Sequence, residues 1–187
     1  MLNTKYIIVE DDEGNILPYT NEEANGNAWF IKELRLVNSA NEEIKALDSL
    51  DNKNKAVYSL PRLTKLKNYA NNFTVDSLAT INVVEHKPNY FKYESNNVNE
   101  GFAVFSEVYY GNGWKTFIDG KETSYIRVNY TLRGMEVPAG KHIIEFRFDP
   151  DIVKPGISIS FAISVFFGLL FLGVLFYEFK KKPNESS

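Results

Sequence analysis

A stretch of 21 residues without a charged side chain, ISISFAISVFFGLLFLGVLFY at 157–177, constrains this chain more than any other feature. At about 1.5 Å per residue, a helix of this length spans roughly 30 Å, the thickness of the hydrocarbon core of a bilayer. A helix also satisfies its own backbone polar groups within lipid. The core helix of a water-soluble protein rarely runs so far without a charge or an amide. The sequence therefore predicts a transmembrane helix over 157–177.

The charges that flank this stretch predict its orientation. Lys180, Lys181 and Lys182 follow it directly, whereas Lys154 stands alone before it. Because an excess of lysine and arginine marks the cytoplasmic side of a membrane helix, we expect residues 178–187 to form a cytoplasmic basic tail. The bulk of the chain then lies outside the cell membrane.

A domain outside the membrane must be exported, and the first residues carry no recognisable export signal. Residues 1–10 have no basic start and no apolar run of signal length, and an acidic run begins at Glu10. We therefore expect the chain to be the end of a longer membrane protein, as a fragment or through a split gene. The alternative is that the C-terminal helix inserts alone, although a tail anchor leaves its large domain in the cytosol.

Small residues recur on one face of the predicted helix. Ser160, Ser164 and Gly168 are spaced four residues apart. Such a face allows close packing of membrane helices, so we expect a helix partner from the same parent protein or from a second copy. Chance placement of small residues explains the same pattern.

Composition excludes several classes of function. The chain has no cysteine, which rules out disulfides, thiolate metal sites and a cysteine nucleophile. A formal net charge of −3, without a basic stripe before Lys180, argues against a nucleic-acid partner. The residues before the helix are enough to form one sizeable core. Aromatic residues make up 14 % of the chain, which favours strands.

Periodicity predicts a mainly β fold, an antiparallel, jelly-roll-like β-sandwich with a smaller α/β part before it. Residues 1–76 mix a hairpin around an acidic turn, a strand over Asn27–Val37 and a helix from Ser39 to about Leu50. In that helix Ile44, Leu47 and Leu50 form the apolar stripe, and Glu42 and Glu43 lie on the solvated face. A short helix is expected over Pro61–Tyr69. Residues 77–150 then read as successive short strands separated by turns, such as Asp119-Gly120.

The sequence predicts no catalytic residue, no metal site and no cofactor. The only histidines, His86 and His142, lack a partner at metal-ligand spacing. Asp149-Pro150-Asp151 matches the Asp-x-Asp form that holds a metal and a sugar nucleotide in some glycosyltransferases. Here it follows a strand immediately before the membrane helix, and a strand end is the favoured interpretation.

An aromatic group is the best candidate for a binding site. Tyr109, Tyr110 and Trp114 are joined by a glycine turn, and exposed aromatic faces can stack on sugar rings. Asp119 and Arg127 could hydrogen-bond hydroxyl or phosphate groups of the same glycan. The competing interpretation is that these rings fill or cap the core of the sandwich, as aromatic residues of strands usually do.

Several short motifs run in order along nearly the whole chain. They are GNAWF at 26–30, EEIKAL at 42–47, FAVFSEVYY at 102–110, GWK at 113–115, IDGK at 118–121, RVNY at 127–130, LRG at 132–134 and VPAGKH at 137–142. In these motifs the chain resembles the C-terminal region of the YfhO family of bacterial membrane proteins. The resemblance implies a polytopic parent similar to the GT-C class of lipid-linked sugar transferases, associated with glycosylation of cell-surface polymers. The catalytic acidic residues of such enzymes lie near the N-terminus, so none is carried over to this chain.

Together these observations predict a non-catalytic extracytoplasmic domain plus the last membrane helix of a glycosyltransferase of the cell envelope. Its expected partners are the lipid bilayer, other helices of the parent protein, and a cell-surface glycan or lipid-linked sugar. The alternative is a single-pass, membrane-anchored module that binds a glycan or a protein by itself.

Overall fold

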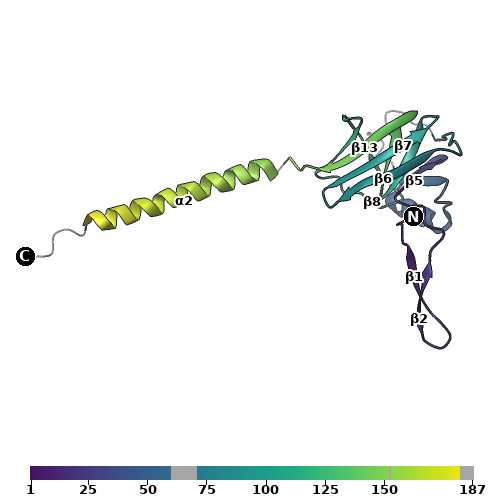
Figure 1. Ribbon diagram of the computed structural model, residues 1–187, viewed down its shortest axis with the longest axis horizontal. Coiled ribbons are helices and arrows are strands. Elements are labelled where there is room, and N and C mark those ends of the chain that lie inside the picture. The colour runs from purple at the N-terminus through teal and green to yellow at the C-terminus, as the bar shows by residue number, and fades with distance from the viewer. Residues whose placement is uncertain (60–70, 152, 182–187) are drawn as a thin grey trace, which may run out of the picture. The chain divides into compact units, whose positions relative to one another are not determined.

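The computed structural model describes residues 1–59, 71–151 and 153–181 (Figure 1). It contains two compact units, Met1–Phe148 and Asp149–Ser187. The helix predicted over Pro61–Tyr69 lies outside the described residues, and so does Lys182.

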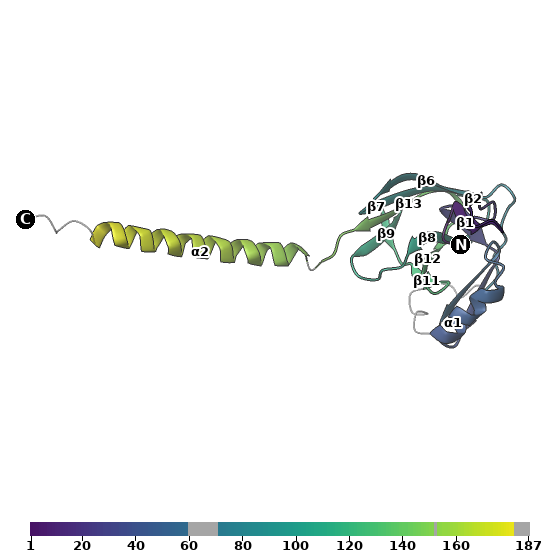
Figure 2. The same ribbon diagram turned by 90° about the horizontal axis from the view of Figure 1, so that it is seen from below.

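Two antiparallel sheets form a sandwich in the first unit, which confirms the predicted fold class (Figure 2). One sheet has the strand order β10-β9-β13-β7-β6 and the other has the order β11-β12-β8-β3. The strands of the first are β6 (Thr80–Lys87), β7 (Tyr90–Asn97), β9 (Trp114–Ile118), β10 (Lys121–Thr123) and β13 (Gly140–Phe148). Those of the second are β3 (Ala28–Ile31), β8 (Gly101–Val108), β11 (Ile126–Val128) and β12 (Leu132–Val137).

Aromatic rings fill the space between the two sheets. Phe105 of the four-stranded sheet meets Phe146 of the five-stranded sheet edge to face, with ring centroids 5.0 Å apart. Tyr93 packs against both rings in the same manner. Edge-to-face pairs add to the stabilisation that burial of their area gives.

A third layer covers the other face of the four-stranded sheet. Strands β4 (Glu33–Val37) and β5 (Lys55–Ser59) pair in parallel, and helix α1 (Ala40–Ala46), continued by the 3₁₀ turn η1 (Leu47–Ser49), connects them. Leu34 and Tyr58 of this layer share a core cluster with Phe102 and Val104 of β8. Strand β8 is therefore buried on both faces, which explains its continuous apolar run. Because β3 pairs with β8, the parts 1–76 and 77–150 share one core.

The predicted strand Asn27–Val37 is two strands that belong to different layers. β3 lies in the sandwich and β4 in the third layer, and the chain changes layer at Lys32. The Lys32 backbone N–H donates to the carbonyl of Asn54 at 2.7 Å, and its carbonyl accepts from the Phe73 N–H at 2.8 Å.

Helix α1 begins as predicted but buries a different side chain. Ser39 Oγ accepts from the Glu42 N–H at 3.2 Å and so caps a free amide of the first turn, and Glu42 Oε2 reaches back to accept from the N–H of Asn38, before the cap, at 3.0 Å. Ile44, expected on the apolar stripe, is 46 % exposed, whereas Glu43 is fully buried. The expectation that Glu43 faces solvent is therefore wrong.

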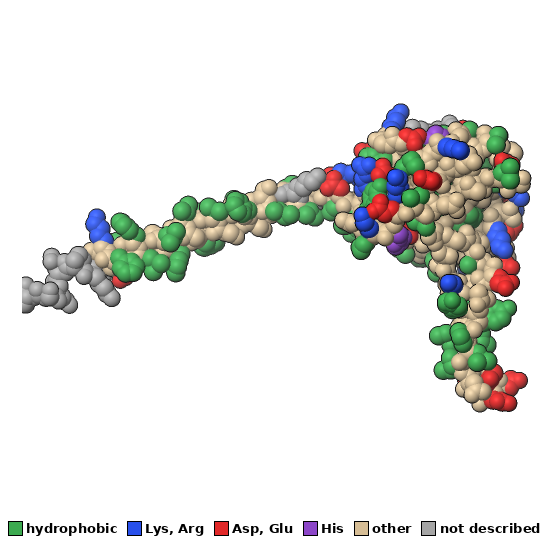
Figure 3. Space-filling view, in the orientation of Figure 1, with side chains coloured by type: hydrophobic (Ala, Val, Ile, Leu, Met, Phe, Trp, Pro, Cys, Tyr) green, Lys and Arg blue, Asp and Glu red, His purple; other side chains and the backbone are tan. Residues whose placement is uncertain are grey.

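A hairpin of β1 (Tyr6–Glu10) and β2 (Ile16–Thr20) precedes the layers, as the sequence predicts. It pairs with no other described strand, and every residue of both strands is exposed. Figure 3 shows its apolar side chains with an acidic tip beyond them.

The second unit is built on helix α2 (Val153–Lys181). Its segment Pro155–Lys180 is long and apolar enough to cross a membrane, and the side chains of this segment are not buried by protein. The predicted helix over 157–177 is thus confirmed as a candidate membrane span.

Candidate functional site

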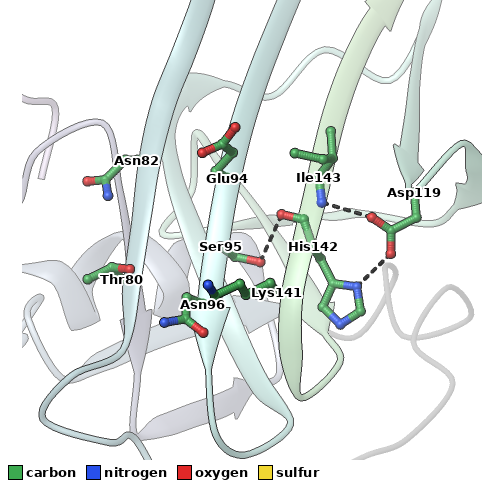
Figure 4. A pocket seen from close by; sticks show the side chains of 9 residues that line it. All are labelled: Thr80, Asn82, Glu94, Ser95, Asn96, Asp119, Lys141, His142 and Ile143. Atoms are coloured by element: carbon green, nitrogen blue, oxygen red, sulfur yellow. Dashed lines mark hydrogen bonds and ion pairs between the residues drawn. The ribbon is translucent and has the colours of Figure 1, made fainter.

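A polar depression of about 350 Å³ lies on the outer face of the five-stranded sheet (Figure 4). Alternate residues of three neighbouring strands provide most of its lining, because successive side chains of a strand point to opposite faces, and Ser95 and His142 also border it. The strand register brings Asn96 of β7 opposite both Thr80 of β6 and Lys141 of β13, while Glu94 lies opposite Asn82 and Ile143. Asp119 and His142 close one side of the depression.

Asp119 and His142 contact each other, and each makes a further hydrogen bond to the backbone at this site. Asp119 occupies the β9–β10 turn with a φ of +50°, next to Gly120 at +79°, as a tight Asp-Gly hairpin requires. Its Oδ1 accepts from the Ile143 N–H at 2.9 Å, and its Oδ2 lies 2.6 Å from His142 Nδ1. His142 Nε2 lies 3.0 Å from the carbonyl oxygen of Ala139. Since a carboxylate and a carbonyl only accept, these two contacts favour the doubly protonated ring, in which both nitrogens donate.

These contacts shift both pKa values. Hydrogen bonding to Asp119 raises the pKa of His142 above its ordinary value, and the bond to Ala139 acts in the same direction. The backbone bond from Ile143, followed by the bond from His142, lowers the pKa of Asp119. An ion pair between Asp119 and His142 therefore lies at the rim of the depression while the ring is protonated.

The pair predicts a pH-dependent contribution to stability. The raised pKa of His142 means that its contribution is complete below pH 6.5 and is lost as the pH rises through the folded-state pKa. The lowered pKa of Asp119 gives a contribution complete above its ordinary pKa of 3.8 and lost in stronger acid. We expect His142→Gln to reduce the free energy of unfolding by up to about 1 kcal/mol near pH 5.5, and by much less at pH 9. Denaturant titrations of both proteins across this range check it; an equal difference at both pH values would contradict the assignment.

The depression offers both donors and acceptors of hydrogen bonds. Lys141 and the amides of Asn82 and Asn96 offer donors, and the carboxylates of Glu94 and Asp119 offer acceptors. The buried Ser95 hydroxyl donates to the carbonyl of His142 at 3.5 Å. Both ring nitrogens of His142 already contact acceptors of the protein, Asp119 and the Ala139 carbonyl, so neither nitrogen is directed at a nucleophile. Within the described ranges, no three His, Asp or Glu side chains gather as a metal site.

The predicted aromatic group lies elsewhere, at the opposite end of β9, which begins with Trp114. Trp114 stacks on Phe91 with centroids 4.9 Å apart and planes 10° apart, and it also contacts Phe148. Tyr109 packs against Tyr125 at 5.4 Å. Trp114 and Tyr109 border a smaller depression of about 130 Å³. Tyr110 is the most open member of the group, with 54 % of the residue exposed.

Arg127, the fifth predicted residue, belongs to neither depression. Its Nη2 lies 3.4 Å from Glu43 Oε2, and its guanidinium lies 4.8 Å from the Tyr130 ring centroid. Glu43 Oε1 also accepts from the backbone N–H of Tyr130 at 2.9 Å. The structure therefore places Arg127 at the contact between α1 and the β11–β12 turn. The five predicted residues are divided among three places.

Sequence reasoning missed Arg133, a buried cation among aromatic rings. Only 3 % of this residue is exposed, and its Nε donates to the Val108 carbonyl at 3.1 Å. Its guanidinium lies 4.4 Å from the Trp114 centroid and 5.1 Å from that of Phe146. The LRG motif contained this arginine, but alternation alone does not reveal that its side chain points inward.

The predicted helix-packing residues all lie on α2. The hydroxyl of Ser164 donates to the carbonyl of Ser160 at 2.9 Å, so this bond stays within the helix. Gly168 follows on the same face, and a Cβ there would meet nothing within 4 Å. Lys180 and Lys181 form the end of the helix.

Comparison with known proteins gives one match. Residues 21–160 match the model of a family described as "Bacterial membrane protein YfhO". Nothing among the curated proteins or the solved structures matches the chain.

Proposed function

Since this chain belongs to the YfhO family of bacterial membrane proteins, we propose that it is the extracytoplasmic C-terminal domain and last membrane helix of a polytopic family member. The matched residues 21–160 run from before β3, through the sandwich, into α2. The matched region thus covers the sandwich, the third layer and the first residues of α2. The parent protein in this proposal is a glycosyltransferase that acts on cell-surface polymers.

The domain itself is non-catalytic in this proposal and contacts the glycan. The observation that carries this role is the polar depression, whose hydroxyl, amide, ammonium and carboxylate groups match the hydrogen-bonding needs of sugar hydroxyls. Asp119 is held in place by Ile143 and His142, so part of the surface is preorganised before a glycan binds. Tyr110 offers a separate exposed ring for stacking, at the end of the sandwich that carries Trp114 and Tyr109.

Glycan binding at the depression can be measured by calorimetry on the full chain in lipid nanodiscs, titrated with cell-wall polysaccharide fragments. Removing one hydrogen-bonding group costs about 1 kcal/mol, so we expect Glu94→Ala to weaken binding roughly fivefold. Glu22→Ala, an exposed carboxylate outside the depression, is the matched control and should leave affinity unchanged. Equal affinities for all three proteins, or no binding, would reject this surface as the glycan site.

The proposed orientation predicts a simple labelling result. Because the chain has no cysteine, a single introduced thiol reports its own side of the membrane. In intact cells, an impermeant maleimide should label Asn112→Cys, which is exposed in the β8–β9 turn, and should leave Ser187→Cys unlabelled until the cells are opened. Labelling of Ser187→Cys in intact cells would reverse the orientation.

A stand-alone, single-pass binding module is the second candidate. It is favoured by the compactness of Met1–Phe148, which has its own core, and by one candidate membrane span in the described part of the chain. Isolation of the protein from its native membrane distinguishes the two candidates. Association of α2 with further helices of the family protein supports the first, and a chain that binds glycan without them supports the second.

A further inference from the structure

The β1–β2 hairpin presents apolar side chains on both of its faces. Tyr6, Ile8 and Ile16 lie on one face, and their exposed fractions range from 55 % to 74 %. The opposite face carries four more exposed apolar residues, namely Ile7, Val9, Leu17 and Tyr19. A two-stranded ribbon is at best marginally stable in water, and further strands stabilise it. The hairpin therefore has the character of a surface that pairs with another chain.

The hydrogen bonds of the hairpin determine which edge can pair. The Asp11 N–H donates to the Asn15 carbonyl at 3.0 Å, and the Asn21 N–H donates to the Lys5 carbonyl at 2.9 Å. Bonded and non-bonded pairs alternate in an antiparallel ladder, so the odd-numbered residues of β1 bond to β2. The even-numbered residues direct their N–H and C=O groups away from β2. These residues of β1 are Tyr6, Ile8 and Glu10.

The outer edge of β2 is poorly suited to pairing. By the same alternation its outward residues are Ile16, Pro18 and Thr20. Proline has no N–H, so this edge lacks its central donor, which is a common protection of edge strands. The outer edge of β1 keeps all three donors.

We propose that β1 pairs antiparallel with β1 of a second copy of this chain, about a two-fold axis at Ile8. Full overlap of the two strands requires Ile8 opposite Ile8 and Tyr6 opposite Glu10. The outward groups then form six hydrogen bonds, two for each facing pair. The same register sets Ile7 opposite Val9 and Lys5 opposite Asp11, which joins β-branched side chains and opposite charges.

The charges of the hairpin disfavour two alternatives, namely pairing of β1 about a different residue and insertion of the hairpin tip into a bilayer. An axis at Glu10 sets two carboxylates opposite each other. Entry of the tip into a bilayer would bury Asp11, Asp12 and Glu13, the acidic end visible in Figure 3. The four-stranded sheet of two copies leaves this tip in water and gives each hairpin an additional neighbour strand.

Cysteine crosslinking of the full chain in detergent micelles tests the register. With a short bismaleimide, Ile8→Cys should give covalent dimers, whereas Ile16→Cys, on the other edge, should give few. Tyr6→Cys alone should crosslink weakly, but a mixture of Tyr6→Cys and Glu10→Cys chains should crosslink well. Equal crosslinking of Ile8→Cys and Ile16→Cys, or none with either, would overturn the proposal.

Proline substitution tests the hydrogen bonds separately. Ile8→Pro removes two of the six intermolecular donors but none of the bonds within the hairpin, so dimerisation should weaken about 30-fold. Ile16→Pro removes an outward donor of β2 and should leave dimerisation unchanged. Circular dichroism and sedimentation of both variants give the fold and the mass. A dimer that persists in Ile8→Pro but is lost in Gly168→Leu is formed by the membrane helix, and it contradicts pairing through β1.

Discussion

Replacing Glu43 by alanine is expected to lower the free energy of unfolding by about 3–5 kcal/mol. The carboxylate is fully buried and accepts from both Arg127 and the backbone N–H of Tyr130. Without Glu43, two groups lose this acceptor: the guanidinium of Arg127, whose side chain is only 17 % exposed, and the backbone N–H of Tyr130. Asn129 and Tyr130 both have positive φ angles, so the turn that Glu43 holds is also strained.

Denaturant unfolding of the full chain in detergent, followed by tryptophan fluorescence, measures this effect. Glu42→Ala is the matched control, because the neighbouring carboxylate is exposed and accepts only the bond from the Asn38 N–H among those described. It should cost about 1 kcal/mol or less. Glu43→Gln keeps an acceptor but loses the charge, so its cost should lie between the two. Equal costs for Glu42→Ala and Glu43→Ala would show that Glu43 does not join α1 to the sandwich.

Gly134→Ala is expected to destabilise the fold by about 1–3 kcal/mol through steric overlap alone. A Cβ at Gly134 would lie 2.6 Å from Phe102 Cε1 and 3.0 Å from Val128 Cγ1. Phe102 is fully buried between the four-stranded sheet and the third layer, so its ring has little room to move. Densely packed interiors transmit such an overlap to their neighbours.

Gly101→Ala provides a graded control in strand β8. There the nearest contact of a new Cβ is Phe30 Cδ1 at 3.1 Å, which a small shift relieves, so the cost should be clearly lower. A double-mutant cycle with Phe102→Leu identifies the cause, because the smaller side chain should recover part of the loss from Gly134→Ala. Strict additivity of the two substitutions would mean that the Phe102 ring is not the obstacle.

Local signals predicted most strands of the sandwich. Asp119-Gly120 adopts the positive φ angles of a tight hairpin and stands between β9 and β10, at the turn that its sequence indicates. In β13, alternation separates buried Ile144 and Phe146 from their neighbours. Such features depend on residues close in sequence, which is why alternation and turn chemistry detect them.

The third layer was not predicted, because it depends on contacts between distant residues. Glu43 reaches Tyr130 across 87 positions, and helical periodicity cannot reveal a partner so far away. By periodicity Ile44 was the better candidate for burial. The parallel pairing of β4 and β5 around α1 was missed for a similar reason. This pair covers one face of β8, but the unbroken apolar run of β8 resembles that of any buried strand and does not indicate what covers it.

The candidate site was predicted only in fragments. Asp119 was chosen for its carboxylate, but His142 was judged only as a metal ligand, so their pairing was missed. Arg127 was assigned to a glycan because a sequence shows charge and not the buried Glu43 that contacts it. Nothing in the spacing of Trp114 indicates that Phe91 stacks on its ring.

The position of β13 determines how the fold bears mechanical force. This strand ends at Phe148 and α2 begins at Val153, so tension on the membrane helix reaches the sandwich through β13. β13 is the central strand of its sheet, bonded to β7 on one side and to β9 on the other. An edge strand can peel away one bond at a time, but a central strand must break both ladders before it leaves. The membrane helix is therefore joined to a strand that is hydrogen-bonded to neighbouring strands on both sides.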